Sequence, residues 1–279
     1  MRSALERFSN EPLPAGRIAL VVAYQGSLYH GWQAQLSDHD TVQGALQKAL
    51  SRVAAHDVAL SCAGRTDAGV HATAQVVHFD TLASRSPHAW VAGTNHFLPP
   101  DIVVRWAGPV STEFHARYSA TAREYRYVIL NQTVPPAQRH RQSTWIHYPL
   151  DEQRMHHAAQ LLLGTHDFSA LRAAECQSKT PVRELHSINV SRHGDYVLLQ
   201  LRANAFLHHM VRNITGTLLP IGEGTRPVSW ISEVLASRDR RCAGITAPAH
   251  GLYLVGVDYP AHFCLPALPK GPAVFPPEI

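Results

Sequence analysis

Hydrophobic residues in the first half of the chain follow two different spacings. The run RIALVVAY, at 17–24, is apolar almost throughout, which is typical of a buried strand. Over 40–54, apolar residues recur every three or four positions, which predicts an amphipathic helix, and Asp40 with Gln43 resembles a capping box at its start. The elements predicted for this half are a strand at 17–24, a helix at 40–54, strands at 57–62 and 74–79, a helix at 87–97 and a strand at 101–106.

The second half repeats this order of elements with a different sequence. In REYRYVIL, at 123–130, Tyr125, Tyr127 and Ile129 fall on one face, as they do in a strand. Asp151 and Gly164 are suitable caps for a helix between them. The elements predicted are a strand at 123–130, a helix at 151–164, a hairpin over 184–203 that turns at 193–195, helices at 207–221 and 229–238, and a strand at 252–259.

Both halves therefore have the order β-α-β-β-α-β, the ferredoxin-like order, with one additional helix in the second half. Two such units predict an α+β fold with an extended, mainly antiparallel sheet, helices packed on it, and a basic cleft between the halves. We expect an N-terminal α+β domain over 1–110, a C-terminal α+β domain over 111–264, and a proline-rich tail over 265–279 without regular structure.

Composition places the chain among ordinary globular proteins, because 45% of its 279 residues are hydrophobic and 16% are charged. The formal charge of +4 permits an anionic partner such as nucleic acid but is equally typical of a solvated basic surface. No apolar run approaches the length of a membrane span, and the first residues lack the apolar core of a signal peptide. We therefore expect a cytoplasmic protein that does not enter a membrane.

The four cysteines are widely separated and form no C-x-x-C pair. This spacing argues against a structural zinc site and against a dense disulfide framework, and it favours reduced thiols. The cysteines are Cys62, Cys176, Cys242 and Cys264.

The stretch AGRTDAGVHA, at 63–72, places Arg65 and Asp67 two positions apart in a loop flanked by Gly64 and Gly69. As a purely structural turn, the loop would use Asp67 to accept local backbone hydrogen bonds and Arg65 to neutralise it. As a functional loop, it would present an ionised carboxylate as a nucleophile or base, with Arg65 available to an RNA phosphate. The loop alone does not decide between the two interpretations.

Further motifs, taken together and in order, favour the functional interpretation of the loop. With them the chain resembles the TruA family of tRNA pseudouridine synthases from about Ile18 to Tyr259. The segments that carry the resemblance are YQGSLYHGWQAQ (24–35), TVQGAL (41–46), GRTDAGVHATAQVVHF (64–79), FHARYSATAREYRYVI (114–129), LLGTHDFSALRA (162–173), CQSKTPVR (176–183), NAFLHHMVRNITGTL (204–218) and TAPAHGLYLVGVDY (246–259).

The resemblance implies an isomerase that converts uridine to pseudouridine at positions 38, 39 and 40 of the tRNA anticodon stem-loop, as a homodimer and without a cofactor. It also assigns the residues of the site. Asp67 is the catalytic aspartate, Tyr125 stacks on the flipped uracil, Arg65 helps to hold the displaced RNA, Arg212 pairs with the aspartate, and Leu254, or less readily Leu252, supplies an apolar wall.

These residue types suit the reaction, which breaks the N1–C1′ bond and joins C1′ to C5 of the same base. A base in a stem must leave its stack at a cost of a few kcal/mol, and an aromatic such as Tyr125 returns about 1–3 kcal/mol. Asp67 has three routes open to it: an adduct at C1′, attack at C6, or a glycal formed by removal of a sugar proton. No oxidation state changes, so no redox cofactor is required.

The sequence departs from the family pattern at two positions. Gln25 stands where the family often has aspartate, and Leu171 stands where an aromatic is common. Both departures concern local RNA contacts. Basic residues that fit an RNA surface, although each alone is typical of solubilising charge, are Arg117, Arg123, Arg126, Arg139, Arg141, Arg172, Lys179 and Arg183.

Two other functional classes make different predictions. A catalytically silent RNA-binding or RNA-folding protein has no need of a carboxylate that faces the RNA backbone. A metal-dependent hydrolase or deaminase would use the histidine pairs in MHHAAQ (155–160) or LHHMVR (207–212), but adjacent histidines on a helix diverge and lack the H-E-x-x-H spacing. We therefore expect no metal site.

Overall fold

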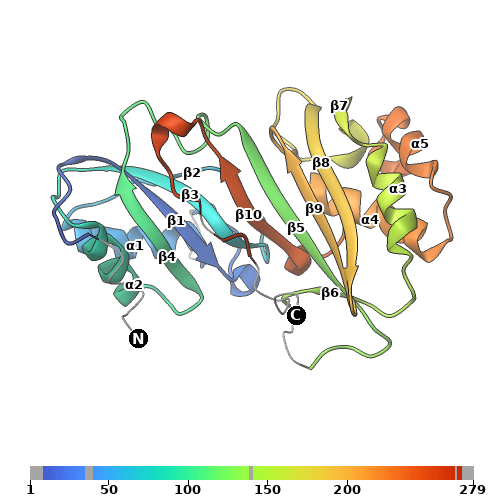
Figure 1. Ribbon diagram of the computed structural model, residues 1–279, viewed down its shortest axis with the longest axis horizontal. Coiled ribbons are helices and arrows are strands. Elements are labelled where there is room, and N and C mark those ends of the chain that lie inside the picture. The colour runs from blue at the N-terminus through green and yellow to red at the C-terminus, as the bar shows by residue number, and fades with distance from the viewer. Residues whose placement is uncertain (1–8, 35–39, 138–140, 268, 272–279) are drawn as a thin grey trace. The chain divides into compact units, whose positions relative to one another are not determined.

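The computed structural model describes residues 9–34, 40–137, 141–267 and 269–271. The chain forms two compact units, and each contains both strands and helices (Figure 1). Within the described residues, the first unit comprises the chain up to Thr121 together with the segment that begins at Leu254, and the second comprises Ala122–Tyr253.

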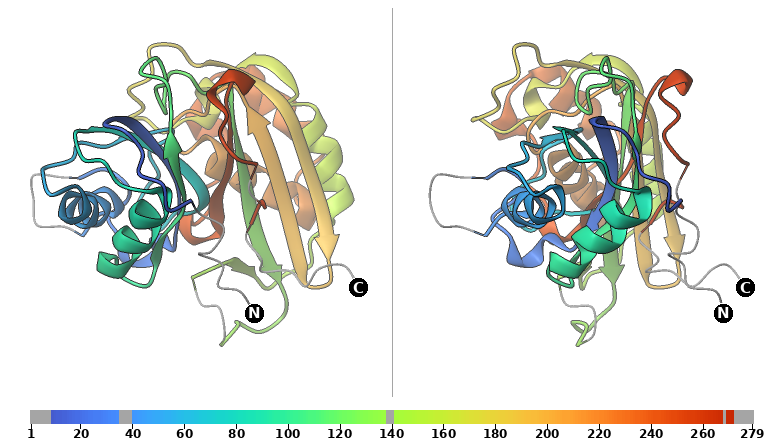
Figure 2. Two further views of the ribbon diagram at one scale, coloured as in Figure 1. Left: turned by 60° about the vertical axis from the view of Figure 1, so that its left-hand side comes forward. Right: turned by 90° about the vertical axis from the view of Figure 1, so that its left-hand side faces the viewer.

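The first unit is built on an antiparallel sheet in which β1 lies between β4 and β3. The short strand β2 pairs with β3, and β10 follows β3 in the sheet order. Helices α1 and α2 lie side by side in both views of Figure 2. The bounds are β1 Gly16–Tyr24, α1 Val42–Ala54, β2 Ser61–Cys62, β3 His71–Thr81, α2 Thr94–Phe97, β4 Ile102–Pro109 and β10 Leu252–Asp258.

The second unit has the strand order β5-β9-β8-β7, with antiparallel neighbours, and β6 pairs with β5 in parallel. Helix α3 packs on β8 and on α4. The bounds are β5 Ala122–Asn131, β6 Thr144–Ile146, α3 Glu152–Gln160, β7 Gly164–Asp167, β8 Val182–His193, β9 Tyr196–Ala203, α4 Met210–Glu223 and α5 Trp230–Ser237.

The predicted α+β class is confirmed, and so are most of the predicted elements. The hairpin turns between His193 and Tyr196, and the helix predicted at 87–97 forms with a π-helical turn at Ala89–Gly93. The predicted strand at 57–62 is reduced to Ser61–Cys62. The short strands β6 and β7 were not predicted, because three or four residues are too few to show a spacing.

The predicted cap of α1 is wrong by one residue. Thr41, rather than Asp40, is the N-cap, because its side chain accepts a hydrogen bond from the backbone N–H of Gly44 at 3.2 Å. For α3 the predicted N-cap is confirmed, since Asp151 accepts from the N–H groups of Gln153 and Arg154. The predicted C-cap Gly164 is wrong, because α3 ends at Gln160 with Leu161 as its C-cap and Gly164 begins β7.

Residues 111–121 belong with the first unit, whereas the predicted division falls at residue 110. Phe114 is fully buried against Tyr259 and Phe263, with ring centroids 5.0 and 5.2 Å apart. The hydroxyl of Tyr259 also donates to the carbonyl of Ala116 at 2.6 Å. This core draws the chain after β10 into the first unit. Part of the predicted tail, residue 268 and residues 272–279, lies outside the described residues.

His78 is buried at the edge of the same core and is neutral at pH 7. Burial is the main reason that its pKa falls to about 4; the nearby Arg17 and His115 act in the same direction, and Asp80 opposes them. Its Nδ1 accepts a hydrogen bond from the backbone N–H of Ala116 at 3.1 Å, which a protonated Nδ1 cannot do. The folded state therefore holds this ring without its proton.

This histidine makes stability depend on pH. In the unfolded chain a histidine has a pKa of about 6.5. The contribution of His78 to the unfolding free energy is therefore fully present above that pH and is lost as pH falls towards 4. Between pH 7 and 4.5 we expect the wild type to lose about 1–2 kcal/mol more unfolding free energy than His78→Gln, whose amide oxygen accepts the same bond without titrating. Urea unfolding at each pH measures the difference, and equal losses in the two proteins would contradict this role of His78.

Candidate active site

The loop that carries Asp67 connects β2 to β3 in the first unit. Its side chains alternate in exposure: Arg65 is exposed, Thr66 is buried, and Asp67 is half-buried. The backbone N–H of Val70 donates to the carbonyl of Asp67 at 3.1 Å, and Gly69 has a φ of +79°, which favours glycine. The loop therefore turns sharply just after Asp67 and leaves Arg65 accessible.

A buried side chain from β3 clamps the start of the loop. Gln75 is fully buried, and its amide forms two hydrogen bonds with Gly64: Nε2 donates to the Gly64 carbonyl at 2.5 Å, and Oε1 accepts from the Gly64 N–H at 3.3 Å. Nε2 also donates to the Tyr24 hydroxyl at 3.4 Å, which bonds to Oγ1 of Thr66 at 2.8 Å. This chain of buried groups fixes the backbone on the N-terminal side of Asp67.

The segment between β1 and α1 braces the loop from outside. The N–H of Trp32 donates to the carbonyl of Thr66 at 2.9 Å. Gly31 has a φ of +94°, and a Cβ there would lie 2.9 Å from the same carbonyl oxygen. At Gly26 a Cβ would lie 1.9 Å from the carbonyl oxygen of Val70. Gly26 and Gly31 therefore let the segment between β1 and α1 come into contact with the backbone of the Asp67 loop, and that contact supports the loop.

Hydrogen bonds fix the conformation of the loop that carries Asp67. Backbone and side-chain hydrogen bonds hold the loop at Gly64, Thr66 and Gly69. Cys62, at the end of β2, is not a competing nucleophile, because burial raises the pKa of its thiol to about 11 against the opposing effect of Arg65. Asp67 therefore stays the predicted nucleophile or base of this loop.

Tyr125 belongs to the second unit, on β5 opposite Leu201 of β9. Its side chain is 9% exposed, and its ring meets the ring of Phe206 nearly edge-on, with centroids 4.9 Å apart. Tyr127, two residues further along β5, donates from its hydroxyl to the carbonyl of Pro248 at 2.8 Å. The β5 aromatics therefore pack firmly, and Tyr127 holds the turn that precedes β10.

Arg212 lies in the first turn of α4, and hydrogen bonds join it to the turn that precedes β10. Its Nε donates to the carbonyl of Ala247 at 2.8 Å, and the N–H of Ala247 donates to the Arg212 carbonyl at 3.1 Å. The fully buried Asn213 adds to this, because its Oδ1 accepts from the Thr246 hydroxyl at 2.7 Å and its Nδ2 donates to the carbonyl of Leu171 at 3.0 Å. Segments of three predicted motifs meet at this helix turn.

The remaining predicted residues are distributed over the two units. Leu254 on β10 is fully buried, and Leu252 is 6% exposed. Of the predicted basic residues, Arg117 belongs to the first unit and Arg139 lies outside the described residues. The others belong to the second unit: Arg123, Arg126, Arg141, Arg172, Lys179 and Arg183.

Arg65 and Asp67 thus share one loop of the first unit, and Tyr125 and Arg212 belong to the second unit. The supporting residues Gln75 and Asn213 were not predicted from the sequence. A weak signal for both exists in the sequence, since each is an amide inside a largely apolar stretch, and a buried amide requires hydrogen-bond partners.

Among the histidine pairs, His156 on α3 has a structural hydrogen bond, because its Nδ1 accepts from the backbone N–H of Val190 at 3.3 Å.

Over the residues that the structure describes, no helix is both long enough and apolar enough to cross a membrane.

The family model described as tRNA pseudouridine synthase matches residues 20–119 and 158–260. These ranges include Arg65, Asp67, Arg212 and Leu254, whereas Tyr125 lies between them.

The chain is also similar to three curated proteins that are each named tRNA pseudouridine synthase A. The protein of Aeromonas hydrophila is 58% identical over 260 residues, which cover 93% of this chain and 96% of that protein. The protein of Klebsiella pneumoniae is 55% identical over 262 residues, which cover 94% and 97%. The protein of Pseudomonas aeruginosa is 55% identical over 256 residues, which cover 92% and 90%.

Proposed function

The chain belongs to the tRNA pseudouridine synthase family, and from this premise we propose that it isomerises uridine at positions 38, 39 and 40 of the tRNA anticodon stem-loop. Family membership makes it an isomerase that acts on tRNA. The proposal adds the target positions, an aspartate nucleophile and the flipping of the target base.

The proposed reaction is balanced within one nucleotide. The N1–C1′ bond breaks, a bond forms between C1′ and C5, the hydrogen on C5 leaves to solvent, and N1 gains a hydrogen. No electrons are transferred to or from the base. The enzyme must therefore expose C1′, stabilise the detached uracil and keep it from escaping while it turns.

We assign the steps to the predicted site residues. Asp67 attacks the target nucleotide, and Tyr125 stacks on its uracil after the base has left the helix. Arg65 holds the displaced RNA through a phosphate, Arg212 pairs with the carboxylate, and Leu254 provides an apolar wall. One observation carries this assignment: Asp67 lies on a loop held by the buried Gln75 amide and by the backbone of residues 26–32.

Release of tritium from tRNA that contains [5-³H]uridine tests the proposal, because the C5 hydrogen is lost when C5 bonds to C1′. We expect release by the wild type without added metal or nucleotide. A matched tRNA with cytidine at positions 38, 39 and 40, labelled only at its remaining uridines, should give none. Equal release from both tRNAs would refute the target positions, and tight binding without release would favour a catalytically silent RNA-binding protein.

We further propose that the enzyme acts as a homodimer, as the resemblance implies, and that it acts in the cytoplasm, as expected from the sequence. Light scattering at the concentration of the activity assay tests the assembly. A mass equal to twice the 30.8 kDa chain is expected, and the mass of one chain would count against a dimer.

A further inference from the structure

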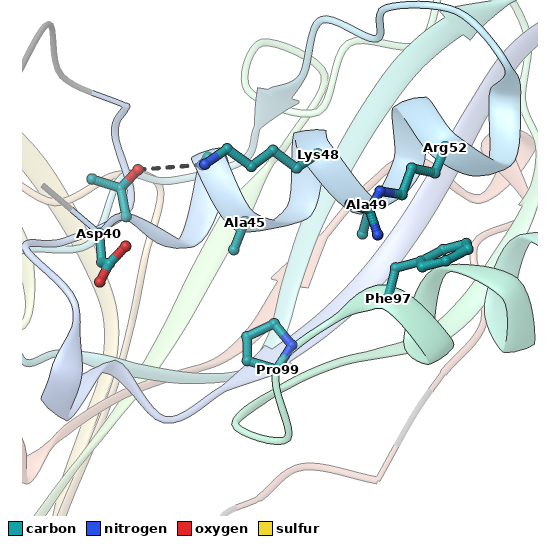
Figure 3. Close-up of a pocket in the computed structure, with 9 residues that line it drawn as sticks. Asp40, Ala45, Lys48, Ala49, Arg52, Phe97 and Pro99 are labelled. Atoms are coloured by element: carbon teal, nitrogen blue, oxygen red, sulfur yellow. Dashed lines mark hydrogen bonds between the residues drawn. The ribbon is translucent and has the colours of Figure 1, made fainter. Parts of the chain in front are cut away.

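A groove on the first unit runs between α1 and the C-terminal end of α2 with the residues just after it (Figure 3). Its volume is about 270 Å³, just below the range of about 300–1,000 Å³ that is typical of small-molecule pockets. This size suits one planar group better than a whole cofactor. The groove is lined by Asp40, Thr41, Gly44, Ala45, Lys48, Ala49, Arg52, Phe97 and Pro99.

One wall of the groove is basic and the other is aromatic. Lys48 and Arg52 lie one turn apart on α1, both are exposed, and neither forms an ion pair with any residue that the structure describes. The Arg52 guanidinium lies 5.1 Å from the centre of the Phe97 ring, and Phe97 is 42% exposed (Figure 3). An exposed aromatic beside an arginine, with a second exposed cation one turn away on the same helix, suits an unpaired nucleotide.

The floor and the far end of the groove complete this surface. Gly44, Ala45 and Ala49 have small side chains, so they leave room for a flat group against α1. The Asp40 carboxylate lies at the other end from Arg52 (Figure 3). A carboxylate accepts hydrogen bonds from the amino group of a base such as cytosine, which gives the groove a means of selecting bases.

The groove is connected to the Asp67 loop within the first unit. The N–H of His30 donates to the carbonyl of Asp40 at 2.9 Å, and the N–H of Gln43 donates to the carbonyl of Trp32 at 3.0 Å. Trp32 in turn donates to Thr66, as described above. The residues that brace the Asp67 loop therefore also anchor the Asp40 end of the groove.

We propose that the groove binds one unpaired nucleotide of the tRNA, other than the uridine that is isomerised. Lys48 and Arg52 bind its phosphates, Phe97 stacks on its base, and Asp40 accepts from a base amino group. Phosphate contacts of this kind fix the register of an RNA on a protein. The inference rests on the proposed function only in taking tRNA as the partner.

The test compares tRNA affinity over a series of salt concentrations. Arg52→Glu should weaken binding and reduce the slope of log affinity against log salt by about 1, as expected for one lost phosphate contact. Phe97→Ala should weaken binding about fivefold or more with an unchanged slope, because stacking releases no counterions. Thermal unfolding of each variant establishes that it is folded.

Arg226→Glu is the matched control. Arg226 is an exposed arginine of the second unit whose guanidinium lies 4.9 Å from the centre of the Trp230 ring, so it reproduces the charge change and the ring contact. It should bind tRNA with the affinity and salt slope of the wild type. Equal losses in Arg226→Glu and Arg52→Glu would overturn the groove as a specific site, and so would wild-type binding by both groove variants.

A free nucleotide is the other source of the same chemistry. If cytidine 5′-monophosphate binds the wild type and not Arg52→Glu, while their tRNA affinities are equal, the groove takes small nucleotides and the RNA proposal fails. The experiments distinguish a failure of the proposed function from a failure of the groove inference. Groove-dependent binding without tritium release removes only the proposed function, and tritium release with no effect of the groove variants removes only this inference.

Discussion

Asp67→Asn should abolish tritium release from tRNA, with a loss of at least about 10⁴-fold, while tRNA still binds. The amide has nearly the size of the carboxylate but lacks the charge and the nucleophilic oxygen, and the loss of a catalytic nucleophile typically has an effect of this order. Because one negative charge near the RNA backbone is removed, affinity should be unchanged or somewhat higher. Single-turnover release and filter binding on the same tRNA measure the two quantities.

Asp57→Asn is a suitable control for this substitution. Asp57 is an exposed aspartate of the same unit, and it lies outside the Asp67 loop. It should retain wild-type release. Asp67→Asn with more than a few per cent of wild-type activity, or with activity lost only in proportion to binding, would show that the carboxylate is not the reacting group.

Gln75→Leu is expected to have the next largest effect, because leucine removes every hydrogen bond of the clamp. The half-buried N–H and carbonyl of Gly64 lose their amide partner, and each unsatisfied buried group costs about 1–3 kcal/mol. We therefore expect a loss of about 2–4 kcal/mol in unfolding free energy. A shift of about 1 Å in the Asp67 loop should also lower kcat by about 10²-fold.

Gln47→Leu separates the two effects of this change. Gln47 is a half-buried glutamine of the same unit, whose Nε2 donates to the Val58 carbonyl at 3.0 Å, away from the Asp67 loop. It should lose about 1 kcal/mol of stability and keep its kcat. Urea unfolding and single-turnover kinetics at saturating tRNA test both variants. If Gln75→Leu loses stability but keeps kcat, the clamp supports the fold and does not position Asp67.

The sequence by itself determined the elements that are long enough to show a spacing. The apolar run at 17–24 forms β1, the helical pattern at 40–54 forms α1, and the hairpin over 184–203 turns where glycine follows His193. It also determined the family, because eight motifs occur in order from about Ile18 to Tyr259 and the family model matches most of that length. Both kinds of signal are local, since they depend on residues within one motif or one turn.

The tertiary structure alone decided which distant residues support the site. Gln75 clamps Gly64 from the neighbouring strand, and Gly26 lies against Val70 with no room for a Cβ. Tyr259 donates to Ala116 from 143 residues away and so places the chain after β10 in the first unit. No periodicity records such contacts, because they arise only when strand pairing brings separate segments together, and the hydrogen bonds that buried polar groups require then select the partners.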